Sequence, residues 1–363
     1  GVHIVRLFGS DGSEATFVVL IDNTPAEIVI ATPANNEYVV QGSAPAADYI
    51  CRDSGSGVAS CSGDVAAGSP IPDNITGTRT FIVNATDNTG LDSSAANTWY
   101  SVQQLEVSGA AGPHSIDTAI SITARATDLD GIDEHLVIDW GDGTVSTSAS
   151  PDPDVVIQNG DSFTADHLYA QPGLYAITVT IEYDGGAHSQ TEVLENAIVF
   201  DSQGGFVTGG GWIDSPPGAY TPNDPADPEI AGRANFNFTS KYQKGGSLPM
   251  GSTNFRFAAG DLVFNSSAYD WMFITGSLVR YRGVGTLKGS SDSYNFQLTA
   301  VDANVAGAGV SRDGFRIKIW QEDNDYGEIV LYDSGLGADD ASGNGGTTQL
   351  GGGSVQIHKT GKK

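Results

Sequence analysis

The strongest constraint on the fold is the spacing of the apolar residues, which alternate with polar residues in short bursts. Residues 174–180 and 315–320 are two such bursts. Alternation over four to eight residues is typical of half-buried β-strands, and the Gly, Asp, Asn and Ser between the bursts favour tight turns. Helical periodicity is nearly absent. The sequence therefore predicts an all-β chain of tandem sandwiches.

Charge and length limit the partners. The chain has 363 residues and a formal net charge of −27. Residues 1–200 hold 4 basic and 27 acidic side chains, and the remaining residues hold 13 basic and 17 acidic ones. This length predicts two to four domains, and the change in charge near residue 200 favours a boundary there. Such acidity excludes nucleic acid as a partner. No run reaches the about 20 apolar residues of a membrane helix, so we expect no membrane insertion.

One pattern recurs along the chain. Residues 2–13, 80–90 and 174–186 each form an alternating strand that enters an Asp/Gly turn, which predicts three copies of one module. The first copy has only its last two strands, and an isolated hairpin is marginal in water. Residues 1–22 are therefore either the tail of a longer precursor or strands that complete their sheet with another chain.

Three segments resemble known families. Residues 23–104 are similar to a bacterial Ig-like surface module through Asp22-Asn-Thr-Pro25, Ala31-Thr-Pro33 and residues 49–61 and 77–87. Residues 105–202 resemble a PKD domain through Ala126-Thr-Asp-Leu-Asp-Gly131, Trp140-Gly-Asp-Gly-Thr144, His167-Leu-Tyr169 and residues 172–180. The PKD pattern usually has Asp-Phe before Gly-Asp-Gly, where this chain has Ile138-Asp-Trp140.

Residues 203–363 resemble a post-COAP-type carboxy-terminal domain of secreted proteins, through residues 205–214, 234–245, 255–264, 283–289 and 315–320. The resemblances imply two Ig-like sandwiches followed by a larger, jelly-roll-like β-sandwich. Modules of the first two families are usually non-catalytic spacers or adhesive stalks of secreted proteins. Residues 1–22 are then the last two strands of a preceding Ig-like module.

The two cysteines lie ten residues apart, at Cys51 and Cys61. A single close pair in a β-rich chain predicts a disulfide and an oxidising compartment. The alternative is a pair of unlinked thiols. A zinc site would need two more soft ligands at suitable spacing, and no neighbouring His or Cys supplies them.

The best ionic candidate is the acidic series between residues 128 and 142, and the ligands that we select from it are Asp128, Asp130 and Asp139. Ca²⁺ takes about six to eight hard oxygens, and an Asp-x-Asp-Gly loop brings carboxylates together around a turn. Some PKD domains bind calcium near this loop, so the resemblance favours it. The alternative is that these carboxylates only accept backbone hydrogen bonds and shape the turn. No cofactor is required for the expected function, and calcium is the one ion that the sequence favours.

Motifs for catalysis are scarce. The six histidines are scattered, and the chain contains no zinc-protease helix, Gly-x-Ser-x-Gly elbow or phosphate-binding loop. We therefore expect no catalytic residues. A set of aromatic residues could stack on sugars, but alternation with polar residues favours inward packing for most of them: Trp212, Trp271, Trp320, Tyr281, Phe236 and Phe238.

The sequence thus predicts a secreted, non-catalytic structural or adhesive protein at the cell surface, a stalk or a subunit of a filament or sheath. Its expected partners are further copies of itself, other surface proteins or a polysaccharide. Residues 1–22 would link subunits by strand pairing. The alternative is an accessory, carbohydrate-binding region of a secreted polymer-degrading hydrolase.

Overall fold

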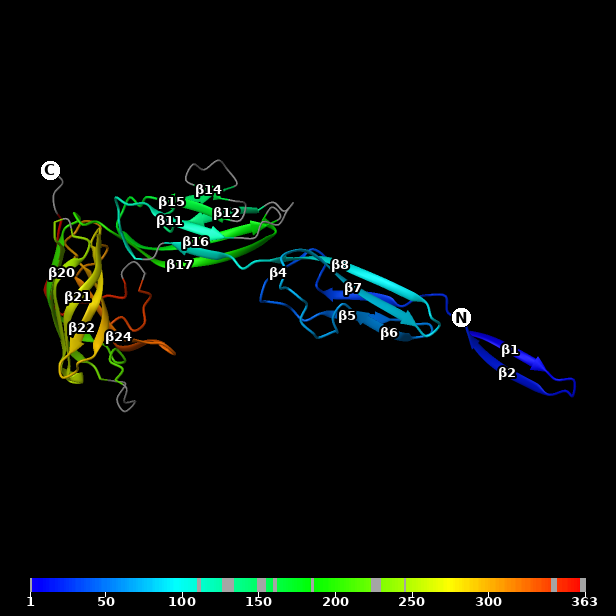
Figure 1. The fold of residues 1–363 in the computed structure, drawn as a ribbon. Helices are drawn as coiled ribbons and strands as arrows, with labels where there is room; N and C mark the ends of the chain where they lie inside the picture. Colours follow the sequence, from blue (N-terminus) through cyan, green and yellow to red (C-terminus); the bar gives the residue numbers. More distant parts are fainter. Residues whose placement is uncertain are drawn as a thin grey trace.

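The computed structural model has β-strands along almost the whole chain and no α-helix in the part that it describes. Figure 1 shows the strands following one another from an amino-terminal hairpin to a large curled sheet at the other end. No helix among the described residues is long and apolar enough to cross a membrane. The structure describes residues 2–109, 112–125, 134–148, 155–158, 162–183, 186–222, 230–244, 246–340 and 345–359.

The described strands form four groups, and each group makes its hydrogen-bonded sheets within itself. The first group is a hairpin of two antiparallel strands, β1 (Val2–Phe8) and β2 (Glu14–Leu20). The later groups end at residues 102, 200 and 358. The division into 1–22, 23–104, 105–202 and 203–363 remains our proposal for the domains.

The second group is a small sandwich. Its two-stranded sheet, β3-β5, faces a sheet with the order β4-β8-β7-β6, in which β4 runs parallel to β8. Alternate residues of β7 are buried, including Phe81 and Val83, and they pack with Trp99 and Tyr49. The strands are β3 (Glu27–Thr32), β4 (Glu37–Val40), β5 (Asp48–Arg52), β6 (Val58–Gly63), β7 (Gly77–Asp87) and β8 (Asp92–Val102).

The third group is a second sandwich with sheet orders β10-β17-β16-β12-β13 and β14-β15-β11-β9. Its core surrounds Trp140, which is fully buried. The strands are β9 (Glu106–Gly109), β10 (Pro113–Ser115), β11 (Ile120–Arg125), β12 (Glu134–Asp139), β13 (Val145–Thr147), β14 (Val155–Gln158), β15 (Ser162–His167), β16 (Gly173–Tyr183) and β17 (His188–Phe200).

The fourth group is one antiparallel sheet of ten described strands, with the order β25-β24-β23-β22-β21-β20-β19-β18-β27 and with β26 paired to β24. The strands are β18 (Phe206–Ser215), β19 (Gly232–Tyr242), β20 (Pro249–Phe257), β21 (Leu262–Thr275), β22 (Leu278–Leu287), β23 (Ser293–Val301), β24 (Gly314–Asp323), β25 (Gly327–Asp333), β26 (Thr348–Gln349) and β27 (Gly352–His358).

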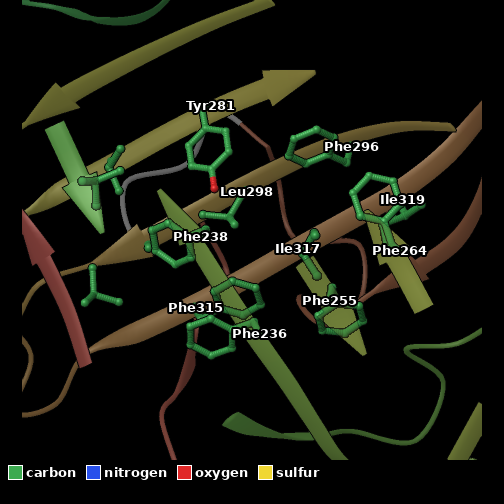
Figure 2. Packing of buried hydrophobic residues seen from close by; sticks show 14 of the residues in the cluster. Phe236, Phe238, Phe255, Phe264, Tyr281, Phe296, Leu298, Phe315, Ile317 and Ile319 are labelled. Carbon is green, nitrogen blue, oxygen red and sulfur yellow. The ribbon is translucent and has the colours of Figure 1, made fainter. Parts of the chain in front are cut away.

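This sheet curls until its edge strand meets the segment that follows β18. Thr221 N donates to Leu331 O at 2.9 Å, and Asp333 N donates to Ala219 O at 2.7 Å. The concave face is filled with aromatic rings, as Figure 2 shows, and the rings of Phe236 and Phe315 stack with centroids 3.8 Å apart. The domain is therefore a half-barrel around one hydrophobic core.

The all-β class and the tandem sandwiches are confirmed. In the last domain, one sheet curls over its own side chains, where we expected two stacked layers of a jelly roll. Each strand pairs with its chain neighbour from β18 to β25, so the sheet is an antiparallel meander. A meander of this length accumulates twist, because adjacent strands rotate in a constant direction.

Candidate functional site at the amino-terminal hairpin

The hairpin of β1 and β2 pairs with no other described strand. Its register places Val5 opposite Phe17 and Leu7 opposite Ala15. The turn between the strands is held by Asp11, whose Oδ1 accepts hydrogen bonds from Ser13 N at 3.0 Å and from Ser13 Oγ at 2.7 Å. These two bonds lower the pKa of the Asp11 carboxyl. Both outer edges of the hairpin present backbone groups that can pair with a further strand.

Large apolar side chains are exposed on both faces of the hairpin. Leu7 is 56 % exposed, Phe17 52 % and Phe8 72 %. Exposed apolar residues scattered singly are normal in soluble proteins, whereas a contiguous apolar patch marks an interaction site. On a hairpin of two seven-residue strands these side chains are contiguous, because residues two apart along a strand share a face.

The β7–β8 hairpin shows what such a face does in a complete module. When the turn glycines Gly12 and Gly90 are aligned, Val5 corresponds to Val83 and Leu7 to Ala85. Val83 and Ala85 are buried, because the β3–β5 sheet covers that side of β7. The face with Val5 and Leu7 therefore has the pattern of a sandwich core, and the described residues do not include a layer that covers it.

Three carboxylates meet where the hairpin joins the next sandwich. One oxygen or more from each of Asp22, Asp53 and Asp87 lies within 4.8 Å of the others. Asp22 follows β2, Asp53 follows β5 and Asp87 ends β7. Ser56 N donates to Asp22 Oδ2 at 2.7 Å, which ties the linker to the β5–β6 loop. A side chain at Gly55 would collide with the Asp22 carboxylate, so this contact requires glycine.

Hydrogen-bond donors lower the pKa of two of these acids, Asp87 and Asp22. Burial opposes the charge of Asp87, but hydrogen bonds from Leu91 N at 2.9 Å and from the Thr89 hydroxyl at 2.8 Å outweigh it and lower the pKa. The N–H groups of Thr24 and Ser56 lower the pKa of Asp22. Ionised carboxylates are ligands for hard cations such as Ca²⁺, so these are the described side chains that could hold a metal. The hydrogen bonds also account for their conformations.

Sequence reasoning missed this cluster, because its members are separated by more than 30 residues and only the fold brings them together. Of the calcium ligands that the sequence predicts, Asp128 and Asp130 lie outside the described residues. Asp139 ends β12, is exposed, and accepts a hydrogen bond from Gly141 N at 2.9 Å. That contact is the turn-shaping alternative, and calcium at these three residues stays a prediction.

The neighbouring Asp142 serves the sandwich core. His167 Nε2 lies 2.9 Å from Asp142 Oδ2, and the His167 ring stacks on Trp140 with centroids 4.8 Å apart. Burial opposes the charge of Asp142, but hydrogen bonds from Thr144 and His167 lower its pKa. Tyr169 donates its hydroxyl to Trp140 O at 2.7 Å. Trp140, His167 and Tyr169 therefore have a structural role in this sandwich.

The structure joins Cys51 and Cys61 in a disulfide, with Cα atoms 5.9 Å apart. Cys51 lies in β5 and Cys61 in β6, and these strands belong to different sheets of the same sandwich. The bond therefore links the two layers at the base of the loop that carries Asp53. It stiffens the end of the module that faces the hairpin.

The aromatic residues considered for sugar stacking are largely buried. Phe236, Phe238 and Tyr281 lie in the core of the half-barrel. Trp271 and Trp320 are also buried, but on the outer face of the sheet and outside that core. Trp212 is half-buried, and the Arg233 guanidinium lies 4.4 Å from the centre of its ring. An exposed row formed by these six rings is therefore not present.

No family model and no curated protein matches the chain. Among solved structures, the extracellular domain of protocadherin GammaB4 is similar, with 10% sequence identity and a TM-score of 0.19. The similarity covers 83% of this chain and 56% of that one, so the chain spans little more than half the length of the protocadherin structure. At this identity and TM-score, the likeness carries no functional argument.

Proposed function

We propose that the chain is a non-catalytic, extracellular structural and adhesive protein, a β-sandwich stalk that assembles into a surface filament or sheath. The hairpin of β1 and β2 carries this proposal, because its core-type face with Val5 and Leu7 is exposed. In the assembled state, a further copy of the chain covers that face and pairs with a hairpin edge. The disulfide supports an extracellular location, since such bonds persist in oxidising compartments.

The symmetry of this contact determines whether a closed dimer or an open filament forms. A contact between two identical hairpins closes as a dimer, whereas a hairpin that docks on a different surface of the next subunit propagates an open filament. The serial sandwiches then space the subunits along the fibre. The proposal is the second arrangement, in which the modules that follow one another along the chain (Figure 1) lie between successive contacts.

The test compares the unaltered protein with a double variant, Leu7→Lys with Phe17→Lys, by sedimentation velocity and negative-stain electron microscopy over a range of concentrations. Burying each of these side chains stabilises by about 1.5–3 kcal/mol, so we expect the variant to associate at least tenfold more weakly. Ile82→Lys is the matched control, because Ile82 is an exposed strand residue on the outer side of β7.

Filaments that disappear in the double variant and persist in the control support the proposal. Closed dimers alone would contradict filament assembly. Monomers at every concentration, or equal association by all three proteins, would contradict self-association through the hairpin.

The accessory carbohydrate-binding region of a hydrolase is the second candidate. It requires an exposed platform for an insoluble polymer, and five of the six aromatic residues considered for that platform are buried. We therefore favour the structural and adhesive function.

A further inference from the structure

A cavity of about 450 Å³ lies between the third strand group and the half-barrel. One wall comes from β16 and β17, where Leu174 and Ile198 are paired neighbours. The opposite wall is the outer face of the curled sheet. The stacking of Phe200 on Tyr242, with centroids 4.9 Å apart, holds the two domains together nearby. The volume is in the range of small-molecule sites, which are about 300–1,000 Å³.

The polar wall is built by strand alternation. Tyr281, Leu298 and Ile317 point into the half-barrel core, so the residues that alternate with them point outward. Cross-strand pairing aligns the outward side chains of four adjacent strands in one row: Trp271, Arg282, Gln297 and Lys318. The first three of these line the cavity.

Two of these side chains carry polar groups without a protein partner. Gln297 is only 8% exposed, yet its amide makes no hydrogen bond to any described residue. Trp271 is 5% exposed as a residue, and its indole N–H likewise has no acceptor among the described residues. Both side chains line the cavity, so these polar groups are available to a molecule that enters it. The Gln297 amide offers that molecule both a donor and an acceptor.

Neighbouring charged and aromatic side chains hold the charged groups around the cavity in place. Lys318 Nζ lies 2.8 Å from Asp340 Oδ2, and Arg316 Nη2 lies 2.9 Å from Asp340 Oδ1. The Arg282 guanidinium lies over the Trp320 ring at 4.8 Å, and its Nη2 is 3.6 Å from Glu322. The carboxylates and the guanidinium are therefore held in place before a ligand arrives. Preorganised groups of this kind lose little entropy on binding.

The chemistry of the lining selects one class of ligand. Three carboxylates, from Glu328, Asp339 and Asp340, disfavour an anion. A purely apolar ligand would leave the Gln297 amide unsatisfied. A neutral molecule with many hydroxyls and an apolar face can donate to the carboxylates, bond the amide and pack on Trp271. We propose that this cavity binds a neutral saccharide, either free or at the end of a glycan.

Both domains contribute to this site, since the apolar wall belongs to β16 and β17 and the polar wall to the half-barrel. A bound sugar would therefore also brace the joint between the domains. The site does not depend on the hairpin, so it can be present whether or not the chain forms filaments.

The test uses the full chain on an array of immobilised neutral oligosaccharides that end in glucose, galactose, mannose or N-acetylglucosamine, with sialylated glycans beside them. The best neutral oligosaccharide is then titrated by calorimetry. We expect Gln297→Leu to bind at least tenfold more weakly, because it removes both bonds of the amide. The matched control is Gln356→Leu, since Gln356 is exposed in β27 on the far edge of the sheet.

A second variant, Ile198→Asp, tests the wall from the other domain and should also weaken binding. Circular dichroism and thermal unfolding show whether each variant is folded, so a loss of binding by a folded protein supports the proposal. Three outcomes would overturn it: no neutral glycan bound by the unaltered chain, binding confined to sialylated glycans, or the same affinity for Gln297→Leu as for the unaltered chain.

Discussion

Arg316 and Asp333 form a bidentate ion pair beneath the outer surface of the half-barrel. Arg316 Nε lies 2.8 Å from Asp333 Oδ1 and Nη2 lies 2.9 Å from Oδ2, while the carbonyl oxygens of Gly345 and Ala338 accept further bonds from the guanidinium. One arginine thus ties β24 and β25 to the loop that follows β25. Burial opposes the charge of Asp333, but the bonds from Arg316 outweigh it and lower the pKa.

Replacing Asp333 by asparagine should destabilise the half-barrel by about 3–5 kcal/mol at neutral pH, because it leaves a buried charge with fewer partners. The contribution of Asp333 is present above the pKa of an unfolded aspartate, about 3.9, and is lost as the pH falls through the lower folded value. Urea unfolding of both proteins from pH 7 to pH 2.5 measures this difference. A stability gap that stays constant down to pH 2.5 would show that the ionised pair does not stabilise the domain.

At the scale of elements, the loop between β5 and β6 organises the junction with the hairpin. The disulfide closes this loop at Cys51 and Cys61, and the loop backbone binds the linker residue Asp22. The same loop therefore fixes the position of the hairpin linker and stiffens this end of the sandwich. The loop contributes no residue to the hydrophobic core, so its order depends on the disulfide and on hydrogen bonds such as that from Asn88 N to Gly57 O at 3.0 Å.

Replacing both cysteines by serine should lower the stability of the 23–104 sandwich by about 2–4 kcal/mol, since the bond constrains the unfolded chain. Thermal unfolding of the full chain in oxidised and reduced form gives the same comparison without substitution. Ser60→Ala is the control for a change in β6 that keeps the bond. If reduction leaves every unfolding transition in place, the bond does not stabilise this module.

Strand positions followed from the sequence, because alternation is a local property. The predicted bursts at 174–180 and 315–320 lie inside β16 and β24. The curl of the last sheet was not predictable, since it depends on pairing between residues 219–221 and 331–333, more than 100 positions apart. The Asp22 cluster and the cavity at Gln297 were not predictable for the same reason, because their residues come from separate strands and loops.

At the scale of the whole molecule, the modules follow one another in a row, and the hairpin lies at one end (Figure 1). A net charge of −27 keeps such a surface hydrated and opposes indiscriminate aggregation. In the assembly that we propose, contacts therefore form where apolar surface is exposed. The hairpin exposes such surface at Leu7, Phe8 and Phe17.

Hydrogen exchange of the backbone amides in residues 2–20 tests this account most directly. The exchange of the unaltered full chain is followed by mass spectrometry at low and high protein concentration, with residues 77–87 as the internal reference. We predict that protection of residues 2–20 rises with concentration, because a second copy covers the hairpin, while residues 77–87 do not change. Residues 2–20 that exchange equally fast at both concentrations would contradict assembly through the hairpin.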